Sequence, residues 1–294
     1  MPARPDAGDR GGEGGRTGVR PAKGSVLVDG HVHFHQGFDR LRFFDSAWHN
    51  FVAGAVRRAL TAPLAGMLCF TESSGAHAFD ALRRLGGQTV AGAWTASPTG
   101  EEESVLVMHA DGQTVPVLAG RQIVTREGLE VLALAWRGEY ADRAPIDVTL
   151  VDLARAGAVP VIPWGFGKWW FRRGALVGSL LHRQDLPRFF LGDNGGRMAG
   201  GPRPRLFAEG EAAGRYVLPG SDPLPFPSQQ EKAGRYGFVL TGELDRRRPA
   251  AWLREHLASL RAQPTVFGQL ERPAEFARAQ IRMQLRNRVE RSRP

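Results

Sequence analysis

Two histidines two positions apart, His31 and His33, are the residues of this sequence whose spacing most directly suggests chemistry. They follow the apolar β-branched run 26–28 and the pair Asp29-Gly30. In a strand, residues i and i+2 share a face, so both imidazoles should point the same way. Imidazole is a common metal ligand, and the pair would supply half of a four-coordinate site. The alternative is that the two histidines are ordinary polar residues at a strand end and bind nothing. The buried run before them favours a metal or ligand site.

Two aspartates follow other short apolar runs. Asp193 follows residues 189–191 after one glycine, in a glycine-rich turn, and Asp222 follows residues 216–218. Prolines then stiffen the loop beyond Asp222, which suits a site that must hold its geometry. Each aspartate could equally be a turn former or a helix N-cap. We predict that both are metal ligands.

The segment 160–173 combines three Trp and two Phe with one Lys and two Arg, between hinge-like glycines. Such side chains could stack on a ring and bind an anion. From this segment we predict Trp164, Lys168, Arg172 and Arg173 as substrate-binding residues. An interface with a partner, or a plug over the mouth of the fold, is an equal alternative.

The apolar spacing predicts alternating strands and helices that would position these residues. The predicted strands are 25–34, 65–71, 88–95, 104–109, 115–124, 129–136, 159–162, 188–191 and 216–218. The predicted helices are 45–60, 76–85, 145–156, 174–182, 250–262 and 274–288.

This alternation favours an α/β fold with a mainly parallel sheet covered by helices. Because several strands end in polar or acidic residues, we expect a distorted (β/α) TIM-like barrel with a β-rich insertion, whose site lies at the carboxyl ends of the strands. The barrel domain would span residues 25–270. Residues 1–24 contain little to bury and should form a disordered leader, and 271–294 a basic C-terminal helix.

Residues 28–33, Val-Asp-Gly-His-Val-His, resemble the first-strand Asp-x-His-x-His signature of the metal-dependent hydrolase superfamily, which comprises the amidohydrolases and the PHP phosphoesterases. Residues 218–223, Leu-Pro-Gly-Ser-Asp-Pro, are similar to the late-strand Gly-Ser-Asp of amidohydrolases. The resemblance spans residues 25 to about 225 and implies that Asp222 is both a ligand and the group that orients a water and takes its proton.

The chain departs from that family pattern in its middle strands. Asp193 stands where relatives have a His, and Gln122 stands nearest to the position of a Glu ligand in PHP proteins. Pro163 and Trp164 occupy a strand end where many relatives place another His. The remaining ligands are His31, His33, Asp193 and Asp222, with Glu72 and His77 as weaker reserves.

Four nitrogen and oxygen ligands suit one divalent ion, Zn²⁺ or Mn²⁺. The leading hypothesis is therefore a metal-dependent hydrolase that activates water against an amide, ester or phosphoester of a small substrate with an anionic part. The alternative is a non-catalytic barrel that binds a small ligand or partner protein through residues 160–173, which we call the aromatic loop. The absence of the ligands expected at the middle strands favours this alternative.

The net charge of +9 is concentrated at the ends of the chain. Residues 1–24 carry +2 and residues 271–294 carry +4, so the intervening 25–270 carry an ordinary +3. No zinc-finger or helix-turn-helix spacing accompanies the basic residues, so a nucleic-acid partner is not expected, and the basic C-terminal helix is its only candidate site.

No apolar run approaches the roughly 20 residues that span a bilayer, and the N-terminus lacks the apolar core of a signal peptide. The single cysteine, Cys69, lies within an apolar run and should be a buried small hydrophobe rather than a nucleophile. A cytoplasmic protein is expected. Oligomeric state is not indicated by the sequence.

Overall fold

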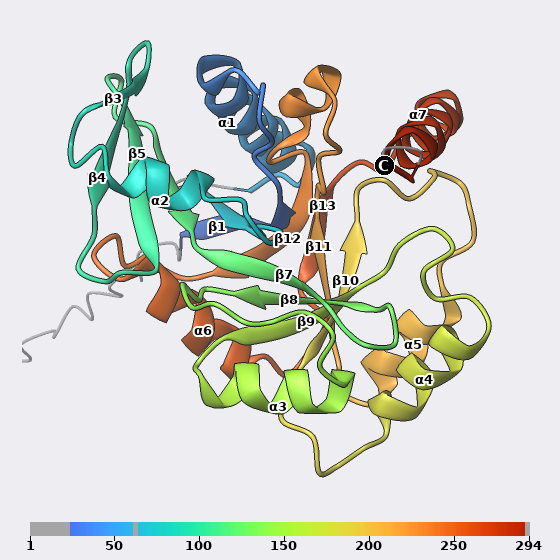
Figure 1. Cartoon of the computed structure of the whole chain (residues 1–294). Helices are drawn as coiled ribbons and strands as arrows, with labels where there is room; N and C mark the ends of the chain where they lie inside the picture. Colours follow the sequence, from blue (N-terminus) through green and yellow to red (C-terminus); the bar gives the residue numbers. More distant parts are fainter. Residues whose placement is uncertain (1–23, 61–63, 292–294) are drawn as a thin grey trace, which may run out of the picture.

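The computed structural model describes residues 24–60 and 64–291, which form two β-sheets flanked by helices (Figure 1). The larger sheet runs in the order β13 (Thr265–Gly268), β12 (Tyr236–Thr241), β1 (Ser25–Val32), β2 (Leu64–Phe70), β6 (Thr114–Leu118), β5 (Ser104–His109), β4 (Trp94–Pro98) and β3 (Thr89–Ala91). The smaller sheet runs in the order β11 (Val217–Gly220), β10 (Phe190–Asn194), β9 (Val159–Pro163), β8 (Glu130–Leu134) and β7 (Gly120–Val124).

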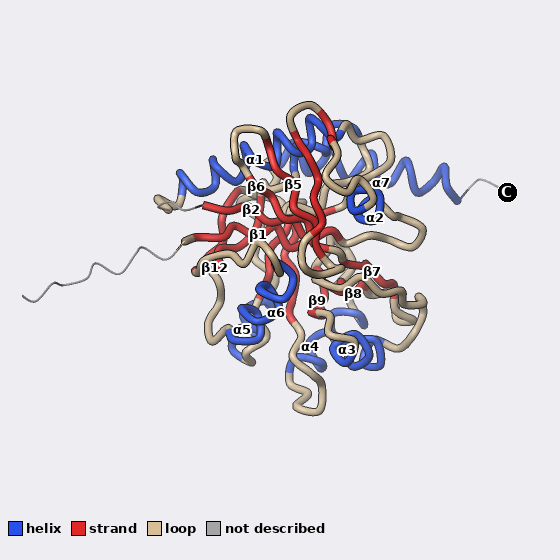
Figure 2. Tube along the Cα trace, turned by 90° about the vertical axis from the view of Figure 1, so that its left-hand side faces the viewer, coloured by secondary structure: helices blue, strands red, loops and turns tan. Residues whose placement is uncertain are grey.

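Helices cover the strands from two sides, as Figures 1 and 2 both show. The upper group contains α1 (Arg40–Arg57), α7 (Pro273–Arg291) and the short 3₁₀ helix η1 (Pro227–Lys232). The lower group contains α3 (Ile146–Arg155), α4 (Arg172–Leu181), α5 (Arg205–Ala212) and α6 (Pro249–Ser259), while the short α2 (Ala78–Arg83) lies beside β4 and β5. Helix α1 begins earlier than predicted because Asp39 caps it, accepting the Arg42 N–H at 2.8 Å.

The predicted (β/α) TIM-like barrel is wrong, because the described strands do not close into one ring. In β1, residues 25–28 pair with antiparallel β12 on one edge and parallel β2 on the other, which leaves β11 no ladder position there. Strand β2 pairs with β6. The smaller sheet is linked to the larger one through a bridge between Glu72, just after β2, and Arg121 of β7. Strand β8 is antiparallel to both β7 and β9, whereas the strands of a TIM barrel are parallel. The fold is therefore a mixed α/β arrangement of two sheets.

The strand-rich middle of the chain explains part of this difference. Strands β3 to β6 form an antiparallel extension of the larger sheet. The predicted strand 115–124 is two strands, since the chain crosses from β6 to β7 at Ala119 and thereby changes sheet. Strands β12 and β13 and helix α5 were not predicted. Strand β12 prevents closure of a barrel, because it pairs with the edge of β1 to which a last parallel strand would have to pair.

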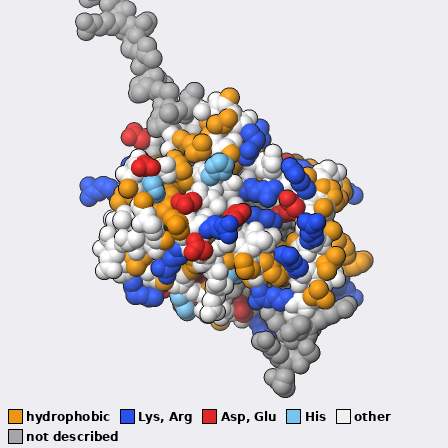
Figure 3. Space-filling model, turned by 90° about the horizontal axis from the view of Figure 1, so that it is seen from above, with side chains coloured by type: hydrophobic (Ala, Val, Ile, Leu, Met, Phe, Trp, Pro, Cys, Tyr) orange, Lys and Arg blue, Asp and Glu red, His pale blue; other side chains and the backbone are white. Residues whose placement is uncertain are grey.

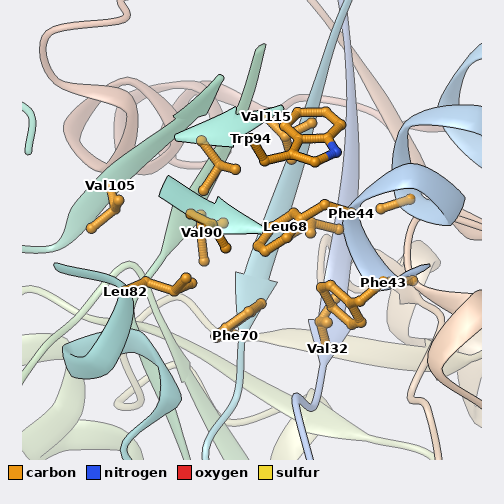
Figure 4. Close-up of a cluster of buried hydrophobic side chains, with 14 of the residues drawn as sticks. Val32, Phe43, Phe44, Leu68, Phe70, Leu82, Val90, Trp94, Val105 and Val115 are labelled. Carbon is orange, nitrogen blue, oxygen red and sulfur yellow. The ribbon is translucent and has the colours of Figure 1, made fainter. Parts of the chain in front are cut away.

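Three hydrophobic clusters hold the layers together. The first lies between α1 and the larger sheet, where Figure 4 shows Phe43, Leu68, Phe70 and Trp94 grouped together. The second lies between the sheets and α6, and the third packs α3, α4 and α5 against the smaller sheet. Cys69 is free and fully buried in the second cluster, as its apolar context predicts.

The predicted leader, residues 1–24, lies outside the described residues apart from Gly24. Helix α7 occupies the segment predicted as the basic C-terminal helix. The upper face of the molecule shows basic side chains interleaved with acidic and hydrophobic ones (Figure 3). In the described part of the chain, no helix is both long and apolar enough to cross a membrane.

Candidate metal centre

The ends of β1 and β11 approach each other closely, although the two strands belong to different sheets. A Cβ at Gly220 would lie 2.2 Å from the backbone nitrogen of His31, and a Cβ at Gly30 would lie 2.9 Å from the Pro219 carbonyl oxygen. Only glycine permits this approach at either position. The backbone of Asp222 then donates its N–H to the His31 carbonyl at 2.8 Å. The Asp-Gly and Pro-Gly pairs of the sequence thus bring His31 beside Asp222.

The buried side chain of Asp29 stabilises the contact between the ends of β1 and β11. Its fully buried carboxylate accepts backbone N–H groups from Ser221 at 2.8 Å, Gly234 at 2.8 Å and His31 at 3.3 Å. Burial raises the pKa of Asp29 to about 7, although the hydrogen bonds from Ser221, Gly234 and His31 oppose the shift. With all three donors on the carboxylate, Asp29 orients the histidine strand rather than acting as a ligand.

Replacing Asp29 with Ala should destabilise the protein, because three buried N–H groups would lose their acceptor. An unpaired buried donor costs about 1–3 kcal/mol, so the free energy of unfolding should fall by at least about 3 kcal/mol. Urea denaturation at pH 7 measures the change. Asp29→Asn keeps one acceptor oxygen and should lose clearly less; equal losses in the two variants would contradict this role.

His31, His33 and Asp222 converge on one point. His31 Nε2 lies 3.1 Å from His33 Nε2, and each of these nitrogens lies 3.6 Å from Asp222 Oδ1. Ligands held tetrahedrally about 2 Å from a zinc ion lie about 3.3 Å from one another. The three observed separations are close to the edges of such a tetrahedron, so this group of residues could hold a divalent metal ion.

His31 Nε2 has three polar neighbours, which is more than one ring nitrogen can hydrogen-bond. Besides His33 and Asp222, it lies 3.3 Å from Oε1 of Gln122 on β7. A neutral imidazole nitrogen either donates or accepts one hydrogen bond, so it cannot satisfy all three groups. Burial, followed by the charge of His31, lowers the pKa of His33 to about 3, which keeps that imidazole in the neutral form that binds metals.

Asp222 is held in an unusual conformation by its surroundings. Its φ of +47° is left-handed, although it precedes Pro223 and residues before proline are normally extended. Asn194 donates from Nδ2 to Asp222 Oδ2 at 3.0 Å, and His35 Nε2 bonds the Pro223 carbonyl oxygen at 2.8 Å. Burial opposes ionisation of Asp222, but the attraction of the neighbouring histidines and Lys168 outweighs it and lowers the pKa of Asp222. Oδ1 is thereby left facing the histidines as an anionic ligand.

Asp193, predicted as a fourth ligand, lies outside this cluster. Its carboxylate receives two hydrogen bonds from Arg197, at 3.0 and 2.8 Å, and one from the Tyr236 hydroxyl at 2.8 Å. The next residue, Asn194, faces the site instead. Adjacent strand residues point to opposite faces, so only one of the two could reach Asp222.

The predicted basic substrate-binding residues form no single cluster, although the charge of Lys168 contributes to the lowered pKa of Asp222. Lys168 pairs with Glu130 at 2.5 Å, and Arg173 donates to the backbone carbonyl of Gly167 at 2.9 Å. Arg172 is exposed at the start of α4. Trp164 alone of the four lines the cavity beside Asp222. The role of these four residues in binding a substrate therefore stays a prediction.

The two reserve ligands are also elsewhere. Glu72 accepts the N–H of Phe79 at 2.9 Å and lies 3.5 Å from Arg121, so it anchors the start of α2. Burial raises the pKa of Glu72, which the hydrogen bond from Phe79 and the charge of Arg121 oppose. His77 is exposed at the N-cap of that helix.

A small cavity of about 60 Å³ adjoins Asp222. Its walls include Trp164, Asn194, Gln229 and Glu271. Two buried oxygen atoms of these residues, Asn194 Oδ1 and Glu271 Oε2, have no hydrogen-bond partner, while Glu271 Oε1 pairs with Lys232. Neither Asn194 nor Glu271 was predicted, since an amide next to an acidic residue and a lone Glu at a helix boundary carry no motif.

No protein-family model matches the chain, and no curated protein matches it. Among solved structures, the chain is similar to the crystal structure of PsfC from Pseudomonas syringae PB-5123. The sequence identity is 14% and the TM-score 0.46, over 90% of this chain and 99% of that chain. A likeness of this degree assigns neither a family nor an activity.

Proposed function

We propose that this protein is a mononuclear metal-dependent hydrolase whose metal ion is held by His31, His33 and Asp222. The observation that carries the proposal is the spacing of their ligand atoms, at 3.1, 3.6 and 3.6 Å. Two nitrogens and one carboxylate oxygen suit Zn²⁺, with Mn²⁺ as the alternative. Three protein ligands with a fourth position open to water or substrate is the arrangement typical of catalytic rather than structural zinc.

A divalent ion at this point would supply Lewis-acid polarisation of the substrate and activation of water at neutral pH. Asp222 takes the proton of the attacking water on its carboxylate, and Asn194 fixes the carboxylate by its hydrogen bond to Oδ2. Gln122, 3.3 Å from His31 Nε2, presents an amide oxygen to the same space and can orient the water.

The small cavity favours an amide or ester over a phosphoester. Two acidic residues, Asp222 and Glu271, stand in its wall, and their negative charge would repel the phosphate oxygens of a phosphoester but not an uncharged amide or ester. We therefore place a small uncharged amide or ester first among substrates. The buried free Cys69 agrees with a cytoplasmic location, which is part of this proposal.

Metal analysis of the purified protein, combined with an activity panel, tests the proposal. We expect one equivalent of Zn or Mn after reconstitution, and metal-dependent turnover of aryl amides and esters that exceeds turnover of matched phosphoesters. One equivalent of metal without turnover on any substrate would favour the alternative of a non-catalytic binding protein. Absence of stoichiometric metal after reconstitution would overturn the proposed centre itself.

A further inference from the structure

A second, larger cavity of about 560 Å³ lies next to the candidate metal centre. Small-molecule sites generally measure about 300–1,000 Å³ and are lined mainly by apolar and aromatic side chains. The walls of this cavity are supplied by the aromatic loop, α5 and α7, with Trp164, Phe166, Trp169, Trp170, Leu206 and Phe276 among them. We call it the aromatic cavity.

The aromatic cavity adjoins the small cavity at Asp222. Trp164 and Phe166 line both spaces, and the Phe166 ring lies against Trp170 at 5.1 Å and Phe276 at 5.4 Å between centroids. A ligand seated among these rings would therefore extend toward Asp222.

The charges in the wall are already neutralised. Arg197 is paired with Asp193 at 2.8 Å, Arg203 with Glu211, and Arg205 with Glu209 at 3.5 Å. A carboxylate or phosphate on the ligand would have to compete with these acids for each guanidinium. The cavity thus suits an uncharged group.

We propose that the aromatic cavity binds an uncharged aromatic ring of the substrate. The ring stacks among Trp164, Phe166 and Trp170, and its polar substituent lies toward Asp222. Only the statement that the bound molecule is the substrate rests on the proposed function; ring binding itself does not require the metal.

Calorimetric titration of the metal-free protein with 2-naphthamide, a neutral bicyclic ring with an amide, tests the inference in the absence of turnover. We expect saturable binding, weaker binding of the anionic 2-naphthoate and weaker binding of the non-aromatic cyclohexanecarboxamide. Trp170→Ala, at a half-exposed position, should weaken 2-naphthamide about tenfold by removing one ring contact.

Phe171→Ala is the matched control, because Phe171 is 90% exposed and is not part of the cavity wall. This variant should bind 2-naphthamide as the wild type does, and so should the His31→Ala/His33→Ala double variant. Tighter binding of 2-naphthoate than of 2-naphthamide, or equal affinities in the Trp170 and Phe171 variants, would overturn the inference. If the wild-type protein bound the ring but took up no metal after reconstitution, the proposed hydrolase would be overturned and the aromatic cavity would stand. Metal-dependent turnover without ring binding would overturn the aromatic cavity and leave the hydrolase.

Discussion

The His31→Ala/His33→Ala double variant is expected to lose its stoichiometric metal. The two imidazole nitrogens lie 3.1 Å apart, and their removal leaves Asp222 as the one remaining ligand of the triad. Changes to groups that merely support metal ligands reduce metal affinity by about 10–100-fold, so loss of two direct ligands should reduce it by more than about 100-fold. Titration with Zn²⁺ against a competing chelator measures the affinity, and elemental analysis measures the content.

A matched control removes two histidines that lie away from the site. His49 and His77 are both exposed, and neither belongs to the cluster. The His49→Ala/His77→Ala variant should retain one equivalent of metal and wild-type affinity. Retention of stoichiometric metal by the His31→Ala/His33→Ala variant would exclude the proposed centre.

The Asp222→Asn variant is expected to lose most of its activity. The amide keeps the size of the carboxylate and an oxygen for the metal, but it cannot take a proton from water. General base catalysis typically contributes about 10²–10⁴-fold, so kcat on the best amide substrate should fall by about that factor. Steady-state kinetics with the metal content verified in each preparation measures the loss, and KM should change far less because the ring site is separate.

Asp111→Asn provides the matched control for this substitution. Asp111 is exposed and pairs with His109 in the turn after β5, away from the cluster. Its kcat should equal that of the wild type. If Asp222→Asn retained wild-type kcat while fully loaded with metal, Asp222 could still be a ligand but would not be the base.

The sequence by itself determined the local part of the candidate site. The apolar run of β1 and the two-residue spacing place His31 and His33 on one face, because alternation is a property of any strand. The Pro-Gly-Ser-Asp segment likewise places Asp222 at the end of β11. Most helices and strands of the first 220 residues also lie near their predicted positions, since they depend on apolar spacing within a short window.

The choice between neighbouring polar residues required the tertiary structure. Asp193 and Asn194 share one strand end, and chemistry alone favoured the acid as a ligand. The orientation of β10 turns Asp193 toward Arg197 and Tyr236 and turns Asn194 toward Asp222. The spacing in the sequence shows that adjacent residues of a strand point to opposite faces. It does not show which of the two faces the site.

Strand pairing also lay beyond the sequence. The alternation of strands and helices predicted a distorted (β/α) barrel with a mainly parallel sheet and a β-rich insertion, yet β12 pairs antiparallel with β1, and β8 is antiparallel to its neighbours. Backbone hydrogen bonds between strands carry no residue-specific signal, so a sequence that predicts each strand does not say which strands are neighbours. The tertiary structure alone decided that Gln122 of β7 and Asn194 of β10 meet the histidines of β1, and that the aromatic loop lines a cavity beside them.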